Sequence, residues 1–174
     1  MSLRSKSLRD LIVRGGAVAA LLAGVAWHSD AARSALAAGP FDGLSGTWSG
    51  GGTISMNTGA RERIRCRVQY VVQNSGNNVQ QDLRCASDSY RFDLVANVAH
   101  SGGSISGTWS ESSRGVGGNI FGNARGGQIN AIAQTGSFSA NLNISTRGSQ
   151  QSVTIQSPGQ EVSEVAITLK KGGR

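Results

Sequence analysis

Apolar and polar residues alternate along most of the chain after residue 43. The clearest example is the stretch 61–73 (RERIRCRVQYVVQ), in which every second residue from Ile64 to Val72 is apolar and most of the others are basic or amide side chains. A period of two is typical of a β-strand with one buried face and one solvated face. Similar short runs recur to residue 170 and are separated by Gly, Asn and Ser, which favour turns.

This pattern predicts about 8–10 strands with a turn roughly every 8–14 residues. Such spacing is typical of an all-β antiparallel meander closed as a small barrel, with a β-sandwich as the alternative. The last run also fits helical spacing, but its β-branched residues favour a strand. The predicted strands are 44–56, 64–72, 79–85, 90–98, 105–109, 120–124, 128–134, 138–146, 151–156 and 162–170.

The second and third runs predict a hairpin with a specific register. Folding them about Ser75 and Gly76 places Val72 opposite Val79 and Val68 opposite Leu83, so one register pairs all the apolar residues. Arg67 and Arg84 then also face one another across the two strands.

The same register places Cys66 opposite Cys85. A cross-strand disulfide requires close Cβ atoms, which only the non-hydrogen-bonded pairs of an antiparallel ladder provide. A four-residue turn over 74–77, closed by Gln73 and Asn78, puts the cysteines on such a pair. We therefore expect this turn and a disulfide with its Cα atoms within about 7 Å.

The N-terminal 37 residues have the layout of a secretory signal peptide. Residues 1–14 are basic, residues 15–27 are apolar and uncharged, and Ala35-Leu36-Ala37 provides a small-x-small cleavage site. We expect cleavage after Ala37, a single all-β domain over 38–174 and a periplasmic or secreted location; an uncleaved anchor is the alternative. A disulfide fits this compartment.

The residues that usually carry catalysis or bind metals are scarce. His100 is the only histidine after the predicted signal peptide, the two cysteines are expected to be paired, and no G-x-S-x-G turn is present. Zinc sites of the usual ligand types cannot be assembled from these residues. We therefore expect no enzyme activity, no metal and no cofactor.

One charged feature stands out from the background of a chain with a net charge of +7. Its arginines alternate along one predicted strand and share one face, and a further arginine lies opposite on the next strand. The simplest interpretation is a solvated outer face; the alternative is a surface that contacts an acidic envelope component or a partner protein. Nucleic acid is a poor fit for an exported domain. These residues, the arginine stripe, are Arg61, Arg63, Arg65, Arg67 and Arg84.

A six-residue tryptophan motif occurs twice. Residues 44–49 (LSGTWS) recur as residues 105–110 (ISGTWS), with Trp48 and Trp109 at equivalent positions. A glycine two residues before each tryptophan lies on the same strand face and leaves room for the indole over the backbone. Simple core packing is the alternative to a role in ligand binding.

The first copy, within residues 41–48 (FDGLSGTW), resembles the first strand of calycin-type barrels, where lipocalins carry Gly-x-Trp and avidins Gly-Thr-Trp. The resemblance implies a barrel with an internal ligand site and a basic residue, Lys170 or Lys171, packed over Trp48. We expect the protein to bind a small apolar or amphipathic ligand. The candidate ligand-binding residues are Trp48, Tyr70, Phe92 and Trp109.

Overall fold

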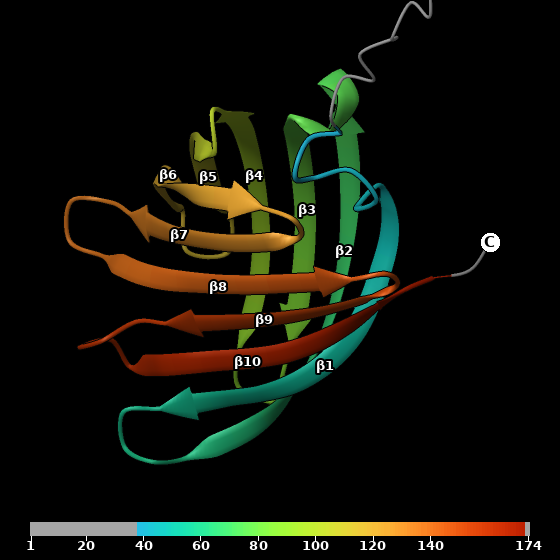
Figure 1. Cartoon of the computed structure of the whole chain (residues 1–174). Helices are drawn as coiled ribbons and strands as arrows, with labels where there is room; N and C mark the ends of the chain where they lie inside the picture. The colour runs from blue at the N-terminus through green and yellow to red at the C-terminus, as the bar shows by residue number, and fades with distance from the viewer. Residues whose placement is uncertain (1–37, 173–174) are drawn as a thin grey trace, which may run out of the picture. The chain divides into compact units, whose positions relative to one another are not determined.

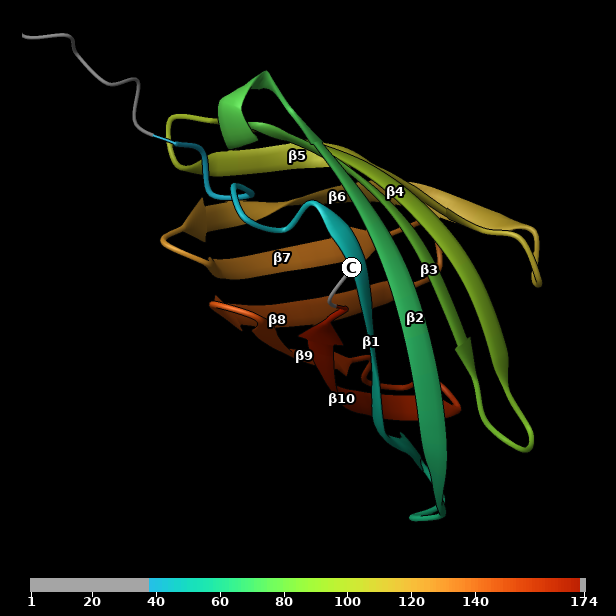
Figure 2. The same ribbon diagram turned by 90° about the vertical axis from the view of Figure 1, so that its right-hand side faces the viewer.

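The structure, a computed structural model, describes residues 38–172 and is a closed barrel of ten antiparallel strands (Figures 1 and 2). Each strand pairs with its neighbours in sequence, and β1 closes the barrel by pairing with β10. The predicted meander barrel is thus confirmed over the sandwich. The strands are β1 Gly46–Met56, β2 Arg61–Gln73, β3 Asn78–Ala86, β4 Arg91–Ser101, β5 Ser104–Glu111, β6 Val116–Arg125, β7 Gln128–Gln134, β8 Ser139–Arg147, β9 Gln150–Gln156 and β10 Val162–Lys171.

The hairpin of β2 and β3 has the predicted register. Gln73 pairs with Asn78 around the four-residue turn, which contains the short 3-10 helix η1 (Asn74–Gly76). Cys66 and Cys85 are opposite and bonded, with 4.1 Å between their Cα atoms. This short separation is the one expected for a narrow, non-hydrogen-bonded pair, so the disulfide and the turn are both confirmed.

The structure corrects one boundary. The sequence predicts a strand over 120–124 and none over 114–118, yet β6 begins at Val116 and its first residues pair with the end of β5. A Cβ atom on Gly118 would lie 1.9 Å from the carbonyl oxygen of Gln134. Glycine is therefore part of this strand because the neighbouring backbone approaches too closely for any side chain.

The two ends of the barrel differ. At one end, the segment 38–45 lies against the β2–β3 turn, where Gly39 and Phe41 donate backbone hydrogen bonds to Ser75 and Gly76. Phe41 and Leu44 of this segment are buried and line the cavity, so we refer to this end as the closed end. At the opposite, open end lie the loops 57–60, 87–90, 112–115, 135–138 and 157–161.

The predicted signal peptide, residues 1–37, lies outside the described residues. Within residues 38–172, no helix is long and apolar enough to cross a membrane.

Candidate functional site

The inward-facing side chains leave a cavity of about 540 Å³ inside the barrel. Its wall is mainly aliphatic and aromatic, and every strand except β1 contributes to it. The alternation seen in the sequence is the cause, because it turns one apolar face of each strand inward. The cavity therefore has the size and the lining of sites that bind small organic molecules.

An aromatic stack forms one side of the open end. The rings of Tyr90 and Phe92 are stacked with 6.4 Å between their centroids. The guanidinium of Arg114, on the β5–β6 loop, lies 4.9 Å from the centroid of the Phe92 ring. Trp109 and Phe138 meet edge to face at 5.8 Å, and both line the cavity. These planar groups give the entrance a surface that is apolar on its faces and polar at its edges.

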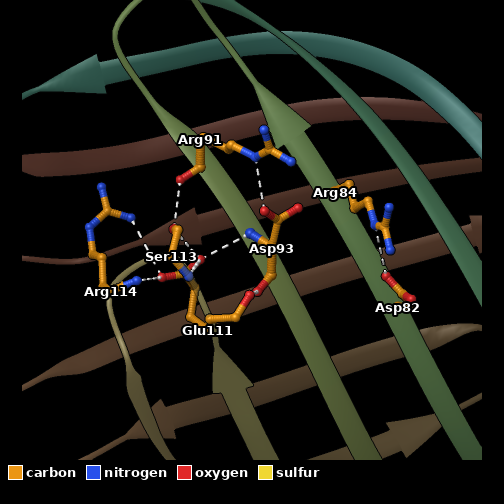
Figure 3. Close-up of polar contacts among 8 residues, drawn as sticks. Asp82, Arg84, Arg91, Asp93, Glu111, Ser113 and Arg114 are labelled. Carbon is orange, nitrogen blue, oxygen red and sulfur yellow. Dashed lines mark hydrogen bonds and ion pairs between the residues drawn. The ribbon is translucent and has the colours of Figure 1, made fainter.

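Glu111 anchors the β5–β6 loop at this entrance (Figure 3). Its carboxylate is only 5% exposed and accepts hydrogen bonds from the backbone N–H groups of Asp93, Ser113 and Arg114 and from the Ser113 hydroxyl. Burial raises the pKa of Glu111, but these hydrogen bonds outweigh it and hold the pKa below its usual range. The ionised carboxylate thus fixes the loop that carries Arg114.

Two further carboxylates mark the rim. Glu161 accepts a hydrogen bond from the Tyr90 hydroxyl, which raises the pKa of Tyr90. Glu62 accepts hydrogen bonds from the Ser87 hydroxyl and the Ser89 N–H, and these lower its pKa. The Glu62 contacts join the loop 87–90 to β2, and the Tyr90–Glu161 hydrogen bond joins the loop 87–90 to the loop 157–161.

A polar pair lies at the inner end of the cavity, close to the closed end. The Tyr70 hydroxyl on β2 donates to Oε1 of Gln151 on β9, with 2.8 Å between the oxygens. Nε2 of Gln151 donates in turn to the hydroxyl of Thr146, 3.0 Å away. Burial raises the pKa of Tyr70, so its hydroxyl stays protonated.

Of the four predicted ligand-binding residues, Tyr70, Phe92 and Trp109 line the cavity and Trp48 does not. Trp48 is fully buried at the closed end, where its indole N–H donates to the carbonyl of Leu44 at 2.7 Å and its ring meets Tyr70 edge to face. The two copies of the motif therefore have different surroundings, because only the first is covered by the segment 38–45.

The arginine stripe is on the outside of the barrel. Arg61, Arg63, Arg65 and Arg67 are exposed and form none of the salt bridges found within residues 38–172. Arg84 faces Arg67 across the strands and contacts Asp82 at 3.6 Å (Figure 3). The expected shared face is therefore present, separated from the cavity by the barrel wall.

Other candidate chemistry is limited. His100 is engaged at the closed end, where Nδ1 lies 2.9 Å from Oδ1 of Asn77 and Nε2 accepts from the N–H of Gly103. In the described part of the chain, no three His, Cys, Asp or Glu side chains are grouped to hold a metal ion.

Sequence reasoning missed the inner polar pair and the entrance residues Glu111 and Arg114. A signal for Gln151 was present, because it occupies an inward position in the alternating run Gln151, Val153 and Ile155. A polar residue on an apolar strand face marks either a buried hydrogen bond or a ligand contact.

No protein-family model matches the chain, and no curated protein matches its sequence. Two solved structures share its fold. One is the crystal structure of Rv2717c from M. tuberculosis, with a TM-score of 0.60, 13% identity and coverage of 76% of this chain and 94% of that one. The other is the S-type phycobiliprotein lyase CPES from Guillardia theta, with a TM-score of 0.53, 8% identity and coverage of 77% and 90%.

The second structure corrects the expectation that this protein is not an enzyme. That expectation was drawn from missing motifs, yet a barrel of the same fold is a lyase by name, so the fold and the absence of those motifs do not exclude catalysis. At identities this low the likeness concerns the fold alone. Both solved structures are small calycin-like barrels, and the chain shares that fold.

Proposed function

We propose that this protein binds a small apolar or amphipathic ligand inside its barrel. The cavity carries the proposal: about 540 Å³ of space lined by aliphatic and aromatic side chains. Pockets that enclose small organic ligands have volumes of about 300–1,000 Å³ and the same mainly apolar lining with a few polar groups. Burying apolar surface in such a space supplies most of the binding free energy.

The open end supplies the entry route. The β2–β3 turn and the segment 38–45 cover the opposite end, whereas the entrance is bordered by the side chains of Tyr90, Phe92 and Arg114. The stacked rings of Tyr90 and Phe92 offer an entering ligand an apolar contact surface at this end.

The test is binding of 1-aminoanthracene, a neutral apolar dye, measured by its fluorescence. Wild-type protein is expected to bind the dye at one site. Ala131→Phe adds a ring to a buried position on the cavity wall and is expected to abolish binding. Ala99→Phe makes the same change on the exposed face of β4 and is expected to leave binding unchanged.

Absence of saturable dye binding to the folded wild-type protein would contradict the proposal. Equal binding by wild type and Ala131→Phe, with native circular dichroism in both, would place the dye on the surface and would contradict it as well.

A second candidate function rests on the arginine stripe. Four exposed arginines that form no salt bridge within residues 38–172 are spaced along one strand, and a bound anion would offset the repulsion between these like charges. An anionic surface of the cell envelope is the partner that this stripe suits. The function would be association of the barrel with that surface.

Sedimentation with phosphatidylglycerol vesicles tests this second function. Replacing Arg65 and Arg67 by Ser is expected to abolish salt-sensitive association. Replacing Arg125 and Arg147 by Ser removes the same charge from exposed positions outside the stripe and is expected to leave it intact. Equal association of both double variants would contradict a role for the stripe.

A further inference from the structure

The mainly apolar lining of the cavity is interrupted at its inner end by two buried polar side chains, Tyr70 and Gln151; the partly buried Gln81 of β3, opposite Tyr70, is also polar. Gln151 is 1% exposed and Tyr70 is 6% exposed, and both line the cavity. They come from β9 and β2, which are separated in the barrel by β10 and β1, so their hydrogen bond crosses the floor of the cavity. We call Tyr70 and Gln151 the floor pair.

The hydrogen bonds of the floor pair leave one donor and one acceptor available. A tyrosine hydroxyl has one O–H donor and can accept as well, and a glutamine amide has two N–H donors. Tyr70 uses its O–H on Gln151, and Gln151 uses one N–H on Thr146. The Tyr70 oxygen can therefore still accept a hydrogen bond, and the second N–H of Gln151 can still donate one.

Charge is confined to the other end of the cavity. The ionisable residues of its lining other than tyrosine and the bonded Cys85 are Glu111, Arg114 and Glu161, and all three lie at the open end. An ionised group brought to the floor would lose its hydration without gaining an opposite charge, which is costly. A neutral hydroxyl can donate to the Tyr70 oxygen and accept from the Gln151 N–H, so it matches both available positions.

We propose that the floor pair recognises a neutral hydroxyl group at the inner end of the ligand. The ligand class is an amphipathic molecule with an apolar body and a terminal hydroxyl, such as a long-chain alcohol, that enters hydroxyl first. This inference rests on the proposed ligand binding in the cavity and adds the chemistry of one end of the ligand.

The experiment measures displacement of 1-aminoanthracene by three probes with eight-carbon chains: 1-octanol, 1-chlorooctane and octanoate. Wild-type protein is expected to bind 1-octanol about three- to ten-fold more tightly than 1-chlorooctane, the range that one or two buried neutral hydrogen bonds provide. Tyr70→Phe is expected to remove this preference by weakening 1-octanol alone. Thr168→Val removes a hydroxyl from the outer face of β10 instead and is expected to retain the preference.

The outcomes separate this inference from the proposed function. If the dye does not bind to the wild-type protein, so that there is nothing for the probes to displace, the proposed function fails. If 1-octanol and 1-chlorooctane bind equally, or if Tyr70→Phe weakens all probes by the same factor, the pair only ties β2 to β9 and the inference is wrong while the proposed function stands. Tightest binding of octanoate, lost in Arg114→Gln, would place the head group at the open end and would also overturn the inference.

Discussion

Nζ of Lys171 lies 5.7 Å from the centroid of the Trp48 ring. The same ammonium group donates a hydrogen bond to the carbonyl oxygen of Gly43, 2.7 Å away. The last residue of β10 therefore holds both the first strand and the segment that precedes it. The resemblance to calycin barrels implied such a basic residue, and the structure assigns this contact to Lys171.

Replacing Lys171 by Met is expected to lower the free energy of unfolding by about 1–2 kcal/mol. A cation over an aromatic ring contributes about 0.5–1 kcal/mol at a partly exposed site, and a hydrogen bond from a charged group adds a similar amount. Urea denaturation followed by tryptophan fluorescence measures the change. Lys170→Met alters an exposed neighbour and should have little effect; equal losses in the two variants would contradict the assignment.

Reducing the Cys66–Cys85 disulfide is expected to lower the free energy of unfolding by about 3 kcal/mol. The bond joins residues 19 positions apart, and closing a loop of this length restricts the unfolded chain by about that amount. The double variant Cys66→Ala, Cys85→Ala should match the reduced wild-type protein in urea denaturation. A stability that does not change on reduction would show that the unfolded chain is not restricted by this bond.

Gly52→Ala is expected to destabilise the barrel by about 2–3 kcal/mol, the cost of forcing an extra group into a packed site. A Cβ atom on Gly52 would lie 1.9 Å from the carbonyl oxygen of Ala166 on the paired strand β10. Gly136→Ala is the matched control, because nothing lies within 4 Å of the added atom. Thermal unfolding should separate the two variants clearly, and a harmless Gly52→Ala would mean that β1 and β10 can move apart.

The parts of the fold that depend on alternation could be predicted from the sequence. The hairpin register followed from matching Val72 with Val79 and Cys66 with Cys85, since a shift of one residue would have exposed every apolar side chain. The start of β6 could not be predicted, because glycine is common both in loops and where two backbones approach closely. Only the distance between Gly118 and Gln134 distinguishes the two cases.

The candidate site was predictable only in part. Phe92 and Trp109 stood out as large aromatic residues on inward faces, and both line the cavity. Trp48 carries the same local motif, but the segment 38–45 covers it, and that packing depends on contacts far apart in the sequence. The bond from Tyr70 to Gln151 joins residues 81 positions apart and becomes apparent only once the barrel has closed.

The Glu111 carboxylate should make the stability of the barrel depend on pH. Its pKa is lower in the folded protein than in the unfolded chain, where a glutamate titrates near about 4.3. Its contribution is therefore fully present above about pH 4.3 and is lost as the pH falls through the lower, native pKa. Glu111→Gln places an NH₂ group where the carboxylate accepts from backbone N–H donors, so at pH 7 it should cost about 1–3 kcal/mol. Urea denaturation between pH 7 and pH 3 should show the difference in unfolding free energy between wild type and Glu111→Gln shrinking at the acidic end.

Asp88→Asn, at an exposed loop position, is the control and should follow the wild-type curve. A difference between wild type and Glu111→Gln that stays constant over this range would show that the hydrogen bonds of Glu111 do not depend on its charge.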